Sequence, residues 1–471
     1  MRSFCRLTSS LAACVIAAFL AVGSSAAQPA DAPNILVLIA DDAGWNDFGA
    51  YGHPSIRTPN IDRLAASGLK VEHAFLTVAQ CSPSRISILT GRYPHQTGAE
   101  DLHMPLPDSL RIVPGYLDET GYFTGHLRKT HYGPNGNAQF DWYSEAADDD
   151  FTDFEGFLDE AGGAPFFMWV GFTDPHRGYG DAPPVHQPSD VRVPPYLVDD
   201  VPTRRDLARY YDEIGRMDGQ IGYFLDVLEA RGLRENTLVV FLSDNGRPFP
   251  RDKGTVYDGG IRTPLIFSWP DVIPAGSSYD AGMVSVIDLA PTWLDVAGID
   301  TPGQMLGESL RPMFADQSVP GRAHVFAERN WHDTDEHIRA VRTDRYKLVR
   351  NAYVQLPHGT PADLGGSPSF RSLIRKKNRG ELTPAQARLF EAPRPRIEFY
   401  DLEKDPFELD NVAAHADYWQ TARELAAVLD EWIDETNDFP PHVRVRDDHT
   451  DRMTGVWFTP EIPPLRNAEW P

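Results

Sequence analysis

Residues 34–42 read NILVLIADD, and this stretch decides the fold class. The apolar run shows no alternation of apolar and polar residues, which is typical of a strand buried on both faces in a parallel sheet. The same texture recurs at 165–172 (PFFMWVGF), 237–242 (TLVVFL) and 264–269 (PLIFSW). Helical patterns separate these runs, so the sequence predicts an α/β fold with a central, mostly parallel sheet flanked by helices.

Four stretches between the predicted strands have the pattern of helices. The first, 58–68, has Pro59 near its start and Gly68 at its end. The longest, 202–231, is amphipathic and is followed by Gly232, a typical helix stop. The other two predicted helices are 84–90 and 284–297.

The pattern changes near residue 323. Short strands are predicted at 324–328, 337–342, 346–350 and 397–402, followed by a helix at 418–436. Between them, residues 351–396 are rich in Pro, Gly and basic residues and predict a long surface excursion. We therefore expect a catalytic domain over 28–322 and a smaller α+β domain with an antiparallel sheet over 323–471.

The first 27 residues have the features of a secretory signal. They combine Arg2 and Arg6, an apolar run at 11–22 and the small residues 25–27. We expect an exported protein, periplasmic or secreted, and a lipoprotein attached at Cys14 ranks second. No later run is long and apolar enough to span a membrane. The formal net charge of −24 argues against nucleic-acid binding.

Two polar pairs follow predicted strands directly. Asp41 and Asp42 end the first strand, and Asp244 and Asn245 follow the strand at 237–242. Each pair alone would be read as a loop or a turn. Ligands bind at the carboxyl ends of strands in α/β sheets, however, and an all-oxygen set suits Ca²⁺ or Mg²⁺ better than zinc. The two pairs together predict a metal site.

Cys81 is the one cysteine that remains after removal of residues 1–27. A single leftover thiol in an exported protein suggests a reactive or modified group, although a buried inert cysteine is the common alternative. It begins the run CSPSR at 81–85, at the start of a predicted helix. Spacing alone does not establish an anion site, but four basic residues could surround an anion. They are Arg85, Lys129, His131 and Lys253.

The segment 81–91 resembles the signature of type I sulfatases, which share the fold of the alkaline phosphatase superfamily. Further stretches are similar to that family's pattern in the same order, and the likeness covers nearly the whole mature chain. They are 33–42, 128–133 (RKTHYG), 174–176 (DPH), 243–246 (SDNG), 253–262 (KGTVYDGGIR) and 400–411.

The resemblance implies a role for each matching residue. Cys81 is expected to be oxidised to formylglycine (3-oxoalanine), whose hydrate is the nucleophile, by a formylglycine-generating enzyme or an anaerobic sulfatase-maturing enzyme. Arg85 would hold that hydrate and His131 would be its proton partner. Lys129 and Lys253 would clamp the sulfate, and His176 would act as general acid. One Ca²⁺ ion would be held by Asp41, Asp42, Asp244, Asn245 and the modified Cys81.

Within the family the likeness is strongest to the sulfamidase (heparan N-sulfatase) branch and to related bacterial polysaccharide sulfatases. It rests on 172–177 (FTDPHR), 215–218 (GRMD), 243–250 (SDNGRPFP) and 435–438 (ETND). Lys253 departs from the Arg of the sulfamidase pattern, which leaves N-sulfate and O-sulfate both open. The expected partner is a sulfated oligosaccharide, contacted by Glu100, His103 and Arg177, although each of these has ordinary surface as its alternative.

Two other functions compete with a sulfatase. One is a phosphomonoester or phosphodiester hydrolase of the same superfamily. That reading is disfavoured because the chain lacks the additional His and Asp ligands such enzymes use. The other is a noncatalytic sugar-binding protein, which would follow if Cys81 stays unmodified.

Overall fold

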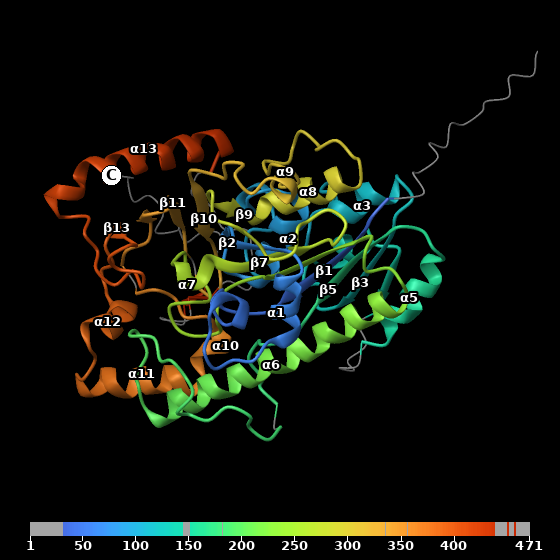
Figure 1. Cartoon of the computed structure of the whole chain (residues 1–471). Coiled ribbons are helices and arrows are strands. Elements are labelled where there is room, and N and C mark those ends of the chain that lie inside the picture. The colour runs from blue at the N-terminus through green and yellow to red at the C-terminus, as the bar shows by residue number, and fades with distance from the viewer. Residues whose placement is uncertain are drawn as a thin grey trace, which may run out of the picture.

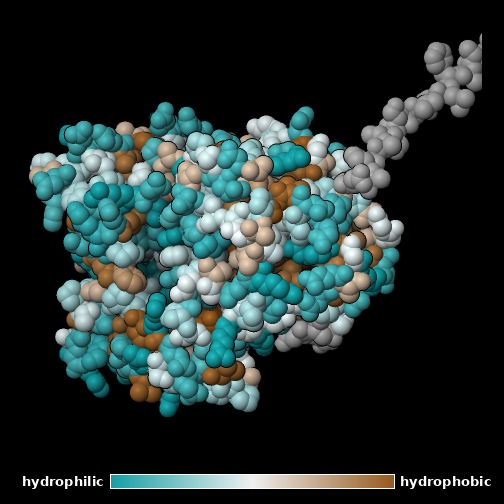
Figure 2. All heavy atoms as spheres, in the orientation of Figure 1, coloured by the Kyte–Doolittle hydropathy of each residue, from teal (hydrophilic) through white to brown (hydrophobic). Residues whose placement is uncertain are grey.

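The computed structural model describes residues 32–144, 151–180, 182–334, 336–355, 357–438, 450–451 and 456–457. The predicted signal at 1–27 lies outside these residues. Across the described part of the chain, no helix is both long and apolar enough to cross a membrane. The face shown in Figure 2 is mostly hydrophilic, with scattered small hydrophobic groups.

A mixed, mostly parallel sheet forms the centre of the molecule (Figure 1). Its order among the described strands is β4-β3-β5-β1-β6-β7-β2-β8, with β9 also paired to β2. The strands β4, β3, β5, β1 and β6 run parallel, whereas β7 is antiparallel to both of its neighbours. The bounds are β1 Asn34–Ala40, β2 Leu69–Phe75, β3 Phe123–Arg128, β4 Trp142–Ser144, β5 Phe166–Gly171, β6 Thr237–Ser243, β7 Arg262–Ser268, β8 Ser277–Tyr279 and β9 Val284–Ser285.

Strand β1 is buried along its whole length because helices cover both faces of the sheet. Ile35, Val37 and Ile39 pack in the cluster that contains residues of α2, α3 and α8. Leu36 and Leu38 pack on the other face, against α1, α5 and α6. The helix bounds are α1 Pro59–Ala66, α2 Cys81–Thr90, α3 Val113–Asp118, α4 Pro134–Asn137, α5 Asp153–Ala161, α6 Val201–Ala230, α7 Asp258–Ile261, α8 Leu289–Val296 and α9 Pro312–Ala315. The unalternating run at 34–40 thus predicts its environment correctly.

Some elements differ from the sequence-based expectation. The predicted helix 284–297 is wrong in its first residues, which form β9 and a 3₁₀ turn at Val286–Asp288 before α8 begins. Pairing of β9 with β2 takes these residues out of the helix. The sequence does not predict strands β2 and β3, because stretches such as LKVEHAF mix charged and apolar residues without a clean period.

The predicted antiparallel α+β unit is confirmed. The sheet order is β10-β11-β12-β13, covered by α13, and Trp432 and Leu429 of that helix pack on Val341 and Leu348 of the sheet. Arg342 and Lys347 of this sheet form buried ion pairs with Asp258 of α7 at 2.9 and 2.6 Å, which join it to the central part. The bounds are β10 Val325–Arg329, β11 Ile338–Arg342, β12 Tyr346–Asn351, β13 Ile397–Asp401, α13 Trp419–Thr436, β14 Thr450–Asp451 and β15 Val456–Trp457, the last two paired with each other.

The surface excursion predicted for 351–396 is wrong as a description of that segment. It contains α10 Ala362–Gly365, α11 Pro368–Arg379 and α12 Pro384–Ala387. Leu364 and Leu373 are fully buried, and α11 packs beside the first turns of α6 (Figure 1). The segment therefore belongs to the packed structure, and α10 reaches the carboxyl ends of the central strands.

Candidate active site

The register between β1 and β6 brings the two polar pairs together. Ala40 lies opposite Ser243, so Asp41 and Asp42 leave the sheet beside Asp244 and Asn245. The Asp42 amide donates a hydrogen bond to Asp244 Oδ1 at 3.2 Å. Asp42 has a φ of 72°, a left-handed conformation that few non-glycine residues adopt and that is often found at functional sites. The predicted meeting of the strand ends is thus observed.

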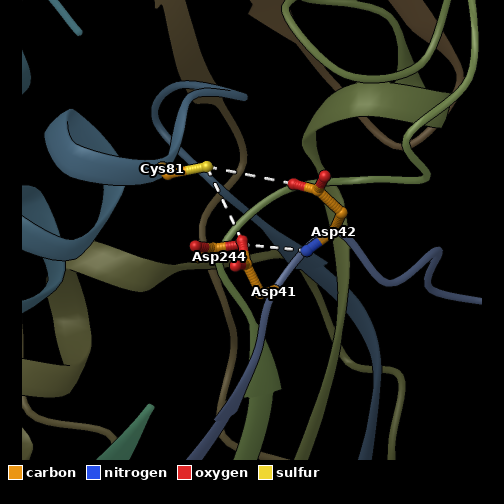
Figure 3. Close-up of side chains that lie close together, drawn as sticks. All are labelled: Asp41, Asp42, Cys81 and Asp244. Atoms are coloured by element: carbon orange, nitrogen blue, oxygen red, sulfur yellow. Dashed lines mark hydrogen bonds between the residues drawn. The ribbon is translucent and has the colours of Figure 1, made fainter. Parts of the chain in front are cut away.

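Cys81 points into this cluster from the first residue of α2 (Figure 3). Its Sγ lies 3.6 Å from Asp41 Oδ1, 3.9 Å from Asp42 Oδ1 and 3.5 Å from Asn245 Oδ1. Every residue of α2 is buried, so the helix holds this side chain rigidly. Burial raises the pKa of the Cys81 thiol well above its usual value despite the nearby lysines. An unmodified Cys81 is therefore a protonated, poor nucleophile.

The donor set fits a hard cation. One carboxylate oxygen from each of Asp41, Asp42 and Asp244 lies within 4.8 Å of the others and of Cys81 Sγ, and the amide oxygen of Asn245 borders the same space. All three carboxylates are buried. Burial raises the pKa of Asp244 although Arg85 opposes the shift. Buried carboxylates gathered in this way are the oxygen ligands that Ca²⁺ prefers.

Two lysines flank Cys81, and each of them pairs with one of the two aspartates that follow β1. Lys129 Nζ contacts Asp41 Oδ2, and Lys253 Nζ donates to Asp42 Oδ2 at 2.8 Å. Burial opposes ionisation of Asp41, but Lys129 and the other cationic side chains nearby together outweigh it and hold the pKa of Asp41 well below its usual range. Burial likewise disfavours charge on Lys253, yet the anionic groups around it, Asp42 first, together raise the pKa of this lysine well above normal. Both lysines are therefore cations beside the thiol.

Arg85 lies beneath Cys81, one turn along α2, and is fully buried. Its Nε donates to Asp244 Oδ2 at 2.8 Å and its Nη1 donates to the Lys129 carbonyl at 2.7 Å. Gly171 ends β5 here, and a Cβ at that position would collide with the Lys129 carbonyl and crowd Arg85. Nη2 of Arg85 is buried and has no hydrogen-bond partner among the described residues. One guanidinium nitrogen thus keeps its donors unused within the buried site.

His131 and His103 form a pair on the Lys129 side. His131 Nε2 lies 2.7 Å from His103 Nδ1, and the His103 amide donates to Ser82 Oγ at 2.8 Å. Burial, followed by the charges of Lys129 and Arg85, lowers the pKa of His131 to about 2. His131 is therefore a neutral imidazole, because its surroundings disfavour the charged form.

His176 faces the cluster from the opposite side. Its Nε2 lies 3.9 Å from Asp42 Oδ2 and 3.4 Å from Asp363 Oδ2. Its Nδ1 lies 2.9 Å from the Arg177 carbonyl, which can only accept, so Nδ1 carries a proton and Nε2 faces the pocket. The side chain is 30% exposed, in contrast with the buried cluster. This placement suits a group that meets the outer part of a bound molecule.

Arg177 and Glu100, predicted as substrate contacts, are placed differently. The Arg177 guanidinium pairs with Asp206 at 2.8 and 3.0 Å and donates through Nε to the Pro248 carbonyl at 2.7 Å. It therefore braces the loop that carries His176. Glu100 is half-buried on the loop that leads to His103. Contact of either residue with substrate stays a prediction.

Asp363 also belongs to this site, although no sequence motif marks it. It lies on α10, and its Oδ2 accepts from Lys253 Nζ at 2.8 Å. Nearby, His332 is buried, with Nδ1 at 3.1 Å from Asp333 Oδ2. No local motif marks either residue. The packing of the segment 351–396 places Asp363 beside Lys253.

Comparison with known proteins agrees with this geometry. Residues 33–299 match the sequence profile of the Sulfatase family, and residues 249–381 match that of the N-sulphoglucosamine sulphohydrolase C-terminal region. The chain belongs to the sulfatase family. This sulfatase is accordingly a sulfuric ester hydrolase, and it is similar to the sulfamidase branch of the family. Its mostly parallel central sheet and its separate antiparallel sheet are those of the alkaline phosphatase-like fold.

Two curated relatives and one solved structure are similar to this sulfatase over most of its length. It is 32% identical to human N-sulphoglucosamine sulphohydrolase, an alignment that covers 96% of this chain and 98% of the relative. It is 30% identical to an ulvan-active sulfatase of Formosa agariphila, over 86% of this chain and 75% of the relative. A solved structure in complex with D-glucosamine-2-N,6-O-disulfate superposes with a TM-score of 0.64 at 21% identity, covering 87% of this chain and 99% of that one. At that identity the superposition supports the fold alone.

Proposed function

We propose that this sulfatase hydrolyses sulfate esters or N-sulfate groups of sulfated saccharides, using formylglycine made from Cys81 together with one Ca²⁺ ion. The observation that carries the proposal is the position of Cys81 Sγ, 3.5 to 3.9 Å from three oxygens of the strand-end cluster. Lysines stand on both sides of it. A nucleophile, cation ligands and anion clamps thus meet at one point.

Asp41, Asp42, Asp244 and Asn245 would hold the cation, together with residue 81 in its modified form. A bound Ca²⁺ supplies charge neutralisation and polarises a sulfate oxygen. Formylglycine supplies a hydroxyl nucleophile in place of the protonated thiol.

The chain's own side chains then have separate tasks. Lys129 and Lys253 bind the sulfuryl oxygens, where negative charge develops in the transition state. Arg85 holds the hydrated residue 81 through its available Nη2. His131 would be the proton partner of the hydrated residue 81, which it would meet as a neutral imidazole. His176 donates a proton from Nε2 to the leaving atom.

Maturation has to precede complete folding. Cys81 is only 3% exposed and α2 is buried throughout, so a modifying enzyme cannot reach the thiol in the native protein. We infer that a formylglycine-generating enzyme or an anaerobic sulfatase-maturing enzyme acts on the unfolded CSPSR segment, before or during export directed by residues 1–27.

The proposed division into a catalytic domain at 28–322 and a C-terminal domain at 323–471 is testable by limited proteolysis.

A saccharide substrate is supported by the relatives, whose names specify N-sulphoglucosamine and ulvan. The test is sulfate release by the protein produced with a maturing enzyme. We expect sulfate from 4-nitrophenyl sulfate and from a subset of heparin, chondroitin, carrageenan and ulvan oligosaccharides. Cys81→Ala, made in the same host, is the matched control and should release none. Faster release of phosphate than of sulfate from the two 4-nitrophenyl esters would reject the proposal in favour of a phosphohydrolase.

A further inference from the structure

The side chains of this site differ in their exposure to solvent. Cys81, Asp42 and Lys253 are almost completely buried. By contrast, the side chains of His176 and Asp363 are 30% and 23% exposed, and they lie next to each other. Because the proposed function assigns His176 to the leaving atom, that atom also lies beside Asp363, whose Oδ2 is 3.4 Å from His176 Nε2.

Asp363 is held at this point by the fold of its own segment. The Ala362 amide, at the start of α10, donates to Asp333 Oδ2, and the following Leu364 is fully buried. One carboxylate oxygen of Asp363, Oδ2, serves both Lys253 at 2.8 Å and His176 at 3.4 Å. Its other oxygen, Oδ1, has no hydrogen-bond partner among the described residues. Oδ1 is buried, so Oδ2 is the oxygen that can meet a ligand beside His176. A carboxylate oxygen has two acceptor positions, and the hydrogen bond from Lys253 at 2.8 Å occupies one of them.

Nitrogen and oxygen leaving atoms differ at the position that Asp363 faces. A sulfamate nitrogen carries one N–H in the bound substrate, whereas an ester oxygen carries only lone pairs. Hydrolysis of a sulfamate breaks the N–S bond and follows R–NH–SO₃⁻ + H₂O → R–NH₃⁺ + SO₄²⁻, so the leaving amine ends as an ammonium ion. Both the substrate N–H and the product ammonium can donate to a carboxylate. An ester oxygen is instead repelled by it.

We propose that Asp363 is a specificity-determining residue that favours nitrogen over oxygen as the leaving atom, and hence N-sulfated amino sugars over O-sulfated ones. The inference rests on the proposed function and deepens it. Residue 253 is Lys where the sulfamidase pattern has Arg, so this position does not decide between N-sulfate and O-sulfate. Asp363, which accepts a hydrogen bond from Lys253, supplies a separate reason to expect N-sulfate.

Two matched sugars test the inference. N-sulfoglucosamine and glucose 2-O-sulfate differ only in the leaving group, NH or O. Asp363→Asn keeps the size of the side chain, removes its charge and adds an N–H that can donate to an ester oxygen. A hydrogen bond to a charged group is worth about 10- to 100-fold in kcat/KM. We expect the kcat/KM ratio of N-sulfate to O-sulfate to fall by about that factor in Asp363→Asn and in Asp363→Ala.

Controls separate this role from general damage. Arg375→Gln removes an ion pair to Asp200 from α11 of the same segment, 3.3 Å long and away from the pocket, and should leave the ratio unchanged. Equal losses on both sugars in Asp363→Asn would overturn the inference, because Asp363 would then act only through Lys253 or His176.

Failure of the proposed function is distinguishable. Absence of sulfate release by the matured wild type from both sugars and from 4-nitrophenyl sulfate would reject the sulfatase mechanism itself. Turnover of 4-nitrophenyl sulfate without turnover of N-sulfoglucosamine would overturn the role of Asp363 and leave the sulfatase activity standing.

Discussion

His126 makes the stability of this sulfatase depend on pH. Its ring lies on β3 among aromatic neighbours, with centroids 4.9 Å from Phe140 and 5.4 Å from Tyr143. Both ring nitrogens are buried and have no hydrogen-bond partner among the described residues. Burial lowers the pKa of His126 from 6.5 to about 4. The native protein therefore holds this ring neutral at pH values where the unfolded chain binds a proton.

The sign and size follow from linkage. Above pH 6.5 neither state protonates the ring, so the free energy of unfolding has its full value. As the pH falls from 6.5 toward about 4, only the unfolded chain gains a proton, and stability is lost. The loss reaches about 2 kcal/mol near pH 5 and about 3 kcal/mol at the lower limit. His126→Phe removes the titration and keeps an aromatic ring among aromatic neighbours.

The assay is urea denaturation of wild type and His126→Phe at pH 7.5 and at pH 5. We expect the variant to lose about 2 kcal/mol less than wild type between the two conditions. Other buried histidines titrate in both proteins and cancel in this comparison. His415→Gln, at an exposed position, is the control and should behave as wild type. Identical pH dependence in wild type and His126→Phe would refute the reasoning.

Three further predictions concern the site. Cys81→Ala should abolish sulfate release while lowering the free energy of unfolding by only about 1 kcal/mol, measured by thermal unfolding, because one small side chain is lost. Ca²⁺ at about 100 times its Kd should stabilise the protein by about 2 to 3 kcal/mol. EGTA should reverse this gain, and Asp244→Asn should weaken it. Arg177→Ala should destabilise the protein by about 3 kcal/mol, because it leaves Asp206 buried without its cation. Unchanged stability with a raised KM would show instead that Arg177 meets the substrate.

The strand-end cluster could be predicted because a few local rules determine it. An unalternating apolar run places β1 in the centre of a parallel sheet, and parallel strands end at the same edge. Asp41 and Asp244 had to meet once β1 and β6 were neighbours, which the register confirms. The resemblance to sulfatases added Lys129 and Lys253, whose approach to the cluster no sequence period encodes.

Asp363 could not be predicted from sequence because its position depends on long-range packing. It follows Pro361 in a stretch with loop-like composition, and the helix that carries it has only four residues. Contacts distant in sequence fix its position: the Ala362 amide donates to Asp333, and the next helix, α11, packs on α6. Likewise, residues 284–285 have helical character but pair with β2, since a tertiary partner overrides local propensity.

The most direct test of the account relates turnover to the chemical state of residue 81. Protein made with graded amounts of a maturing enzyme is digested with trypsin, and the peptide spanning residues 71–85 is weighed by mass spectrometry. Formylglycine is identified by the replacement of sulfur and two hydrogens by one oxygen. The account predicts that sulfate release rises in proportion to the formylglycine fraction and extrapolates to zero for pure thiol. Equal turnover by protein that contains only Cys81 thiol would contradict it.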